Sequence, residues 1–440
     1  MSVQVSLIKR DSGDARLVRE STPAAMLSDR FYKAQQHLFE KINKTLSSFN
    51  LDALKDKAEN IFGTTCTGCY LVAQGGFNTV FILTFKDRDD VVARLLGSRS
   101  GNDSADLEAV AILVERKKSE VAIHHFLKKK TTIPVPHIYY FDPYFNNPVM
   151  VPFMLMERVH GRTLADVWHS LSADEQTKTY TRLIEYNAQL LQLEFNSVGS
   201  LYNDGSADEF TVGPLGGSCT FGTPLRGFQG PFTNSQSYLL AHAEAHLHSL
   251  LYKSELWKAR RLSSDWHNGG ADGISIEYAT TWLQLFCKGV RGLPAEPVTS
   301  ILYHDDLGVG NIIVSYDDPT NIVAVIDWEG SRVLPIWENG LLSKFIQDER
   351  IAEYDADLAK RFGDIENSIY SESNPQLGRS RLNLGSLVFF LSDWTMAIYS
   401  REVINQEFLQ WFQQGCKEGY LEEIRSFSEL KDFIEGISRA

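Results

Sequence analysis

Two short stretches of acidic and amide side chains could perform metal and proton-transfer chemistry together. The first, HDDLGVGN at residues 304–311, has the spacing His-x-Asp-x-x-x-x-Asn, and the second contains Asp327, which follows an apolar run. Asn311 and Asp327 offer oxygen atoms, the ligands that Mg²⁺ prefers when phosphate and water complete its coordination. Asp306 could accept the proton of a hydroxyl group that attacks a phosphoryl group, while His304, the other candidate catalytic residue, would brace the loop.

A β-hairpin would bring these side chains together. Residues 312–315 and 322–326 have strand character, and the segment DDPTN at 317–321 is a turn signal between them. Folding this hairpin returns Asp327 to the neighbourhood of Asn311. The alternative is a solvated acidic turn beside a core histidine, but the full order of motif, strand, turn, strand and aspartate favours a metal site.

A glycine turn upstream could hold phosphate. Gly75, Gly76, Phe77 and Asn78 lie between two β-type runs. Glycine lets the backbone approach phosphate closely, and exposed amides can donate to phosphate oxygens. Because any hairpin can contain such a turn, only its position upstream of the other motifs gives it weight.

A cation follows on the next strand but one. Arg94, in the run VVARLL, could grip phosphate through its planar guanidinium group if a glutamate of the following helix held it. We expect Glu120 to be that glutamate, with Glu108 and Glu115 as alternatives because sequence does not fix the rotation of a helix. The competing interpretation of Glu120 is a solvent-facing helix residue.

Three regions are expected along the chain, in an α+β, two-lobed layout. Residues 1–62 form an N-terminal extension with short helices, 63–157 a small lobe of antiparallel strands and one helix, and 158–440 a larger, mainly helical lobe that contains the hairpin. Where the lobes join, Glu157 and Val159 would offer backbone groups to an adenine ring.

Composition excludes several classes of protein. The formal net charge of -13 disfavours a nucleic-acid binder, which needs a basic surface. No apolar run approaches the ~20 residues that span a bilayer, so we expect no membrane insertion. Five cysteines do not make a disulfide framework. Cys66 and Cys69 are expected to be reduced thiols near the start of a strand, in a cytoplasmic protein, with mitochondria as the alternative location.

Taken in order, these motifs resemble the phosphotransferase family of aminoglycoside and choline kinases, especially its large fungal branch. The resemblance covers about residues 50–345 and rests on a shared order of short motifs: GGFN (75–78), VVAR (91–94), SEVA (119–122), IPVP (133–136), ME (156–157), HDDLGVGN (304–311) and IDWE (326–329).

The resemblance implies a protein-kinase-like fold, ATP and Mg²⁺ as cofactors, and transfer of the γ-phosphoryl group to a hydroxyl of a small molecule, for which a cationic acceptor is one option. By position, Asp306 would be the base, and Asn311 and Asp327 would hold the metal. The sequence departs from the family where Arg94 replaces the usual lysine and where Asp305 stands in place of a frequent glycine. Asp305 could act on the base or attract a cation, but we favour a solvated side chain turned away.

Two other functions remain open. The arginine at position 94 and the long segment 200–232 are also compatible with a nucleotide-binding pseudokinase that has a scaffold or regulatory role. A protein kinase is disfavoured because no activation segment ending in Ala-Pro-Glu follows Asp327.

Overall fold

The computed structural model describes ten parts of the chain: residues 49–74, 78–96, 107–203, 209–216, 229–252, 284, 287, 291, 297–336 and 356–373. The described residues fall into two compact units. The first unit takes the residues up to Ser172 together with Val309–Asp327, and the second takes Ala173–Gly308 and the residues from Trp328 onward.

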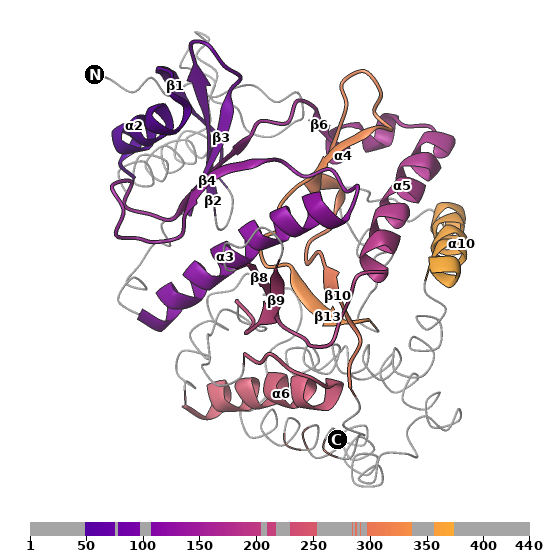
Figure 1. The fold of residues 1–440 in the computed structure, drawn as a ribbon. Helices are drawn as coiled ribbons and strands as arrows, with labels where there is room; N and C mark the ends of the chain where they lie inside the picture. The colour runs from indigo at the N-terminus through magenta and orange to yellow at the C-terminus, as the bar shows by residue number, and fades with distance from the viewer. Residues whose placement is uncertain are drawn as a thin grey trace, which may run out of the picture. The chain divides into compact units, whose positions relative to one another are not determined.

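A five-stranded antiparallel sheet is the framework of the first unit, with strand order β1-β2-β3-β5-β4 (Figure 1). The expected meander and its following helix are confirmed. The strands are β1 (Cys66–Gln74), β2 (Asn78–Phe85), β3 (Val91–Leu96), β4 (Ile138–Asp142) and β5 (Phe153–Glu157).

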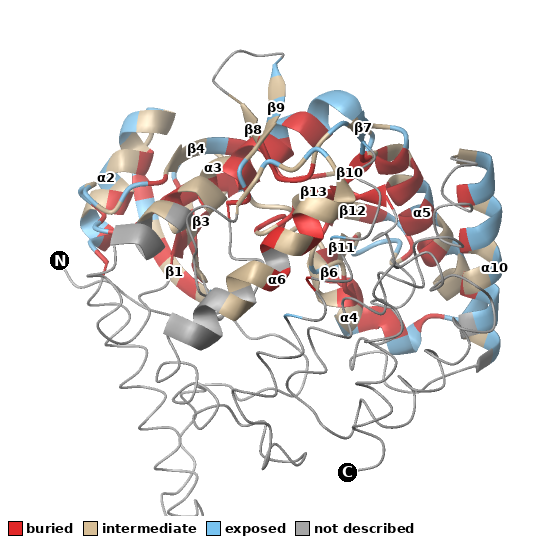
Figure 2. Ribbon diagram, turned by 90° about the horizontal axis from the view of Figure 1, so that it is seen from below, coloured by how far each residue is buried: buried red, intermediate tan, exposed pale blue. Residues whose placement is uncertain are grey.

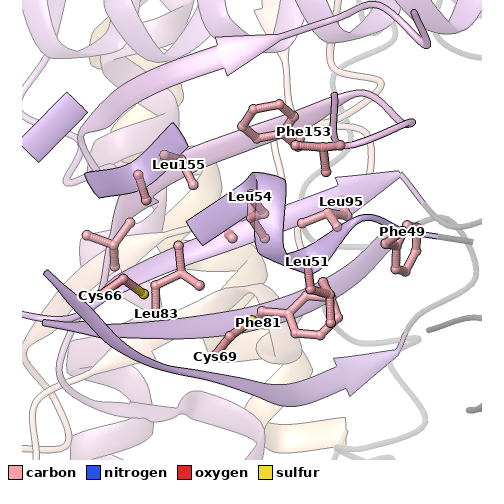
Figure 3. Packing of buried hydrophobic residues seen from close by; sticks show 14 of the residues in the cluster. Phe49, Leu51, Leu54, Cys66, Cys69, Phe81, Leu83, Leu95, Phe153 and Leu155 are labelled. Atoms are coloured by element: carbon pink, nitrogen blue, oxygen red, sulfur yellow. The ribbon is translucent and has the colours of Figure 1, made fainter. Parts of the chain in front are cut away.

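One face of this sheet packs against α2 (Leu51–Phe62), as the close-up of the cluster shows (Figure 3). The helix begins at Asn50, whose side chain accepts a hydrogen bond from the amide of Ala53, and ends at Gly63, which has φ 66°. Its buried leucines meet Phe81, Leu83, Leu95 and Leu155 of the sheet, and full burial of each leucine contributes about 1.5–3 kcal/mol.

The opposite face carries α3 (Leu107–Lys130). Alternate residues of β3 point to opposite sides of the sheet, so Val91, Ala93 and Leu95 join the cluster on the α2 side, while Val92 packs in a separate cluster with Val121 of α3. Arg94 shares the face of Val92. The period-two pattern of β3 therefore directs the arginine toward α3.

The expected hairpin also forms. Its strands are β11 (Ile312–Val314) and β12 (Ile322–Val325), preceded by the 3₁₀ turn η3 (Val309–Asn311). The side chain of Asp318 closes the turn by accepting hydrogen bonds from the amide and hydroxyl of Thr320. β11 also pairs with the short strand β6 (Arg162–Thr163), which leads into α4 (Leu164–Val167) and the 3₁₀ turn η2 (Trp168–Ser170).

The described part of the second unit contains helices of 18 or 19 residues and strands of two to four residues. The ring of Tyr180, on α5 (Ala173–Leu191), stacks on Phe362 of α10 (Ala356–Ser373), with the centroids 3.8 Å apart. The buried residues Phe362, Glu366 and Tyr370 recur at every fourth position of α10, with exposed residues between them (Figure 2), as expected for a helix that rests on a neighbour by one face. The remaining elements are β7 (Glu194–Phe195), β8 (Ser200–Asn203), β9 (Phe210–Gly213), α6 (Ser235–Tyr252), β10 (Ser300–Tyr303) and β13 (Arg332–Pro335).

These units divide the chain differently from the three regions expected from sequence. α2, assigned there to an extension, belongs to the core of the first unit. The hairpin, assigned to the helical lobe of 158–440, groups with the first unit because β11 pairs with β6 and the amide of Val325 donates to the carbonyl of Pro134 at 2.8 Å. The part of the extension before residue 49 lies outside the described residues.

Cys66 and Cys69 are free thiols buried against α2. Burial raises the pKa of Cys69 to about 12 and raises that of Cys66 as well. A protonated, buried thiol is a poor nucleophile and metal ligand, so this pair serves packing.

Candidate active site

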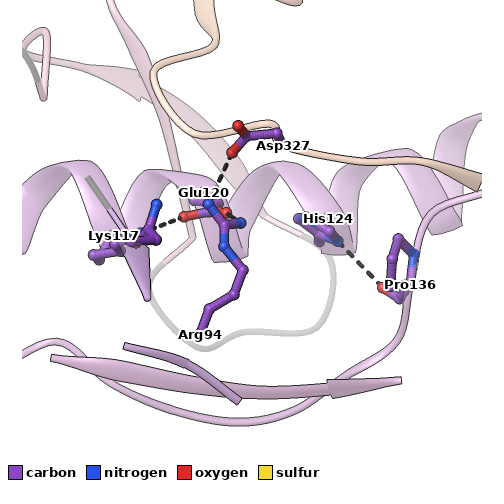
Figure 4. A network of polar contacts seen from close by, with 7 residues as sticks. Arg94, Lys117, Glu120, His124, Pro136 and Asp327 are labelled. Atoms are coloured by element: carbon purple, nitrogen blue, oxygen red, sulfur yellow. Dashed lines mark hydrogen bonds and ion pairs between the residues drawn. The ribbon is translucent and has the colours of Figure 1, made fainter. Parts of the chain in front are cut away.

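Arg94 links two carboxylates within the first unit (Figure 4). Its Nη1 donates to Oε1 of Glu120, and its Nη2 donates to Oδ1 of Asp327 at 2.8 Å. The arginine side chain is only 11% exposed. The planar fork of a guanidinium group suits this geometry, because its two terminal nitrogens can serve acceptors on different elements.

Glu120 is the partner among the three glutamates considered, and it is not solvent-facing: its side chain is 0% exposed. Burial alone would raise the pKa of Glu120, but the positive charges of Arg94 and Lys117 outweigh it and lower this pKa to about 2. Glu115 instead pairs with Lys118, with a side chain that is 43% exposed. The carboxylate that holds the arginine therefore stays charged at any physiological pH.

Lys117 is a second cation on the same carboxylate, and sequence reasoning missed it. Its Nζ donates to Oε2 of Glu120 at 3.1 Å and to Oδ1 of Asn78 at 3.2 Å. Asn78 is the first residue of β2 and directly follows the glycine turn in sequence. The lysine thus joins the end of that turn to the Arg94–Glu120 pair.

His124 completes a polar row on α3. Lys117, Glu120 and His124 are separated by three and four residues, so they lie along one face of the helix. The ring Nδ1 donates to the carbonyl of Pro136 at 3.2 Å. Burial lowers the pKa of His124 to about 4, although the charge of Glu120 opposes this. Because residues 115–120 are all polar (ERKKSE), the sequence carried no signal that set Lys117 apart from its solvated neighbours.

Backbone contacts fix the position of Asp327 relative to Asn311. The amide of Ile326 donates to the carbonyl of Asn311 at 2.9 Å, where the ends of the hairpin meet. Asp327 has φ 65°, in the left-handed region that residues other than glycine adopt rarely. A non-glycine residue held there by its neighbours is a feature of functional sites. Its side chain is 43% exposed, which leaves the carboxylate accessible.

Asp306 and His304 belong to the second unit. His304 is buried, its Nδ1 accepts a hydrogen bond from the amide of Asp306 at 3.2 Å, and its ring packs on Trp328 with the centroids 4.5 Å apart. These contacts brace the backbone of the loop. The expectation for Asp305 was wrong in one respect: its carboxylate is not simply solvated, because the guanidinium of Arg332 donates to it at 2.6 Å.

The other predicted nucleotide contacts lie in the glycine turn and at the end of β5. β1 and β2 form a hairpin with Gln74 opposite Thr79, but Gly75, Gly76 and Phe77 between them lie outside the described residues. At the end of β5, the amide of Glu157 donates to the carbonyl of His137 at 2.7 Å, so this N–H is occupied within the sheet. Val159 follows the strand and lies outside any regular element.

The side chains of Asn311 and Asp327 carry oxygen atoms of the kind that Mg²⁺ prefers. Asn311 and Asp327 offer one amide and one carboxylate, and Mg²⁺ binds through one or two carboxylates together with substrate phosphates and water. Within the part of the chain that the structure describes, no group of three or more His, Cys, Asp or Glu side chains could form an all-protein metal site.

Comparison with known proteins identifies the family. Residues 72–368, more than half of the chain, match the Phosphotransferase enzyme family. A subtelomeric hrmA-associated cluster protein of Aspergillus fumigatus is 25% identical over 314 residues, which are 61% of this chain and 58% of that protein. Altered inheritance of mitochondria protein 9, mitochondrial, of Zygosaccharomyces rouxii is 27% identical over 276 residues, 52% of this chain and 43% of that protein. The chain thus spans less than two thirds of the length of these relatives.

Two solved structures are also similar. Amicoumacin kinase hAmiN, in complex with AMP-PNP, Ca²⁺ and amicoumacin, has a TM-score of 0.42 and 12% identity and covers 88% of this chain and 99% of its own. ADP-bound aminoglycoside phosphotransferase APH(2'')-Ib has a TM-score of 0.41 and 13% identity, with coverage of 84% and 97%. Among the helices described here, none is long and apolar enough to cross a membrane. On its match over residues 72–368, the chain belongs to the Phosphotransferase enzyme family and has an α+β, two-lobed kinase-like fold with a small β-rich lobe and a larger, mainly helical one.

Proposed function

We propose that this protein transfers the γ-phosphoryl group of ATP to a hydroxyl group of a small molecule. Family membership supports a phosphotransferase activity in general. The observation that carries the proposal is the buried pair of Arg94 with Glu120. It fixes the cation expected to grip the nucleotide phosphates beside Asp327, the carboxylate expected to hold the metal.

In this mechanism the chain's own groups mainly position and neutralise charge, as in other phosphoryl transfers. Asn311 and Asp327 would hold Mg²⁺, which when bound would neutralise part of the charge of the transferred phosphoryl group. Arg94 turns part of its guanidinium group to the phosphates while Glu120 keeps it in place. Because the Glu120 carboxylate is buried and stays ionised, it holds Arg94 throughout and takes no part in the proton transfer.

Asp306 is the proposed general base. It accepts the proton of the acceptor hydroxyl as that oxygen attacks phosphorus, and ADP leaves with the bridging oxygen. His304 holds the backbone of Asp306 from a buried position against Trp328. Because Arg332 neutralises Asp305, Asp305 would attract a cationic acceptor only weakly. The proposed acceptor class is therefore small-molecule alcohols, whatever their charge.

The test is phosphoryl transfer from ATP to a panel of amino alcohols, sugars and aminoglycosides, measured as ADP release and product mass. Asp306→Ala is expected to reduce turnover by about 10²–10⁴-fold, the usual contribution of a general base, while ATP binding persists. Asp305→Ala is the matched control and should keep most of the activity. Turnover by Asp306→Ala equal to that of the wild type would refute the assignment of the base.

A nucleotide-binding pseudokinase is the second candidate, and the pair of Arg94 with Asp327 favours it. An arginine that neutralises the expected metal ligand disfavours metal binding there. In that case ATP would raise the melting temperature equally with and without Mg²⁺, and no acceptor would be phosphorylated. A Mg²⁺-dependent stabilisation together with measurable turnover would dismiss this candidate.

A further inference from the structure

The buried cluster around Glu120 holds one more cation than the proposed mechanism uses. Arg94 occupies one oxygen of this carboxylate and Lys117 the other. The side chains of both cations are at most about a tenth exposed, at 11% and 9%. Glu120 therefore contacts two cations, whereas the proposed mechanism requires only the contact with Arg94.

The balance of charge in this cluster would change if Asp327 bound the metal. Buried charges are costly unless they are paired, and in the printed ion pairs Arg94 and Lys117 share two carboxylates, Glu120 and Asp327. The second carboxylate, Asp327, is 43% exposed, and in the proposed function it turns to the metal. An anionic ligand would then restore neutrality around Arg94 and Lys117.

The position of Lys117 points to the kind of anion. Its ammonium group donates to Asn78, which begins the strand after the glycine turn, and such turns present backbone amides to phosphate. Lys117 also shares Glu120 with Arg94, the proposed phosphate ligand. Two independent contacts therefore place the ammonium between groups that would both face a nucleotide's phosphates.

We propose that Lys117, a residue of helix α3, binds the phosphates of the nucleotide and supplies the ammonium group that strand β3 lacks. The inference rests on the proposed function and names a residue for the same site. Arg94 keeps its contact with Glu120 and shares the phosphates with Lys117 once Asp327 binds the metal. Glu120 orients the ammonium group by accepting its hydrogen bond at Oε2.

An ATP analogue with an acyl group on its terminal phosphate tests which lysine reaches the phosphates. The neutral amine of a nearby lysine attacks the acyl carbonyl carbon, an amide forms, its proton goes to solvent, and ATP leaves; the modified peptide is then identified by mass spectrometry. We expect acylation of Lys117 that excess ATP suppresses at least tenfold. Lys118, its more exposed neighbour with a side chain 37% accessible, should show no ATP-dependent change.

Affinity measurements separate phosphate binding from a purely structural role. Lys117→Met should weaken ATP binding by roughly 10- to 100-fold, the effect of a charge-assisted hydrogen bond, and leave adenosine binding unchanged. Lys118→Met is the matched control and should change neither, while Lys117→Arg should recover part of the ATP affinity.

Each other outcome overturns the proposal in a recognisable way. ATP-competitive acylation of a different lysine, or an equal loss of ATP and adenosine affinity in Lys117→Met, would leave the kinase function intact but make Lys117 a brace. Absence of any nucleotide binding by the wild-type protein would remove both this inference and the proposed function.

Discussion

Replacing Glu120 with glutamine tests the central cluster most directly. The side chain keeps its shape but loses its charge, so two buried cations lose their shared partner. The pKa of Glu120 lies at about 2 in the fold, against an ordinary value of roughly 4.5. At ~1.4 kcal/mol per pH unit this difference corresponds to about 3 kcal/mol of stability. Removing one partner of a buried ion pair costs about 3–5 kcal/mol, so the two figures agree.

The sign of the pH dependence follows from the lowered pKa. The contribution of Glu120 is fully present above the unfolded pKa of roughly 4.5 and is lost as the pH falls toward the folded value of about 2. The difference between the wild-type protein and Glu120→Gln should therefore be constant from pH 5 to pH 8. Below pH 4.5 it should narrow by about 1.4 kcal/mol per pH unit.

Hydrogen exchange with mass spectrometry is the appropriate assay, because a chain with two compact units need not unfold in one step. Peptides from β3 and α3 should exchange faster in Glu120→Gln by a factor that corresponds to about 3 kcal/mol. Glu115→Gln is the matched control on the same helix; its exposed pair with Lys118 should be worth less than about 1 kcal/mol. Equal effects of the two substitutions would refute the view that Glu120 organises the cluster.

Three other substitutions test the remaining contacts of the first unit. Since burial lowers the pKa of His124 to about 4, its contribution to stability is present above pH 6.5 and falls by about 3 kcal/mol toward pH 4. Hydrogen exchange of peptides from α3 should show this dependence in the wild-type protein, and His124→Leu should lack this slope. Gly161→Ala should lower the melting temperature, because the new Cβ would lie 2.4 Å from the carbonyl oxygen of Val314 and relieving such an overlap costs about 1–3 kcal/mol. Arg94→Met frees Asp327, so calorimetry should find Mn²⁺ binding without nucleotide about two- to fivefold tighter. A slope retained in His124→Leu, an unchanged melting temperature or weaker Mn²⁺ binding would contradict the respective contact.

The helices and strands of the first unit could be predicted because their sequence signals are local. Strand alternation, the glycine after α2 and the Asp-Pro turn of the hairpin each depend on residues next to one another in sequence. The same alternation placed Arg94 on a defined face of β3. The division into units could not be predicted in this way, since β11 joins the first unit through pairing with β6, about 150 residues earlier in the chain.

The roles of residues on α3 were harder to predict, because they depend on how the helix is rotated against the sheet. Glu108, Glu115 and Glu120 were all candidates until packing brought Val121 against Val92 and thereby turned Glu120 toward Arg94. Lys117 lies one turn earlier on the same face, within the polar run ERKKSE. The sequence alone therefore predicts a solvent-exposed side chain at this position. Its burial becomes evident only when the sheet lies beneath it.

Arg94 and Lys117 together take the place of the single lysine that is usual in this family, so the arginine need not be an impairing substitution. A single ammonium group is compact and would be hard to divide between Glu120 and Asp327, whereas the two terminal nitrogens of Arg94 serve both. Part of the guanidinium group is thus occupied by carboxylates, and in our proposal the ammonium group of Lys117, from the neighbouring helix, adds a second contact to the phosphates. We therefore expect Arg94→Lys to have no higher ATP turnover than the wild-type protein. The substitution removes the contact with Asp327, and Lys117 already supplies an ammonium group for the phosphates in our proposal. An Arg94→Lys variant with higher ATP turnover than the wild-type protein would show instead that the arginine is a simple impairment.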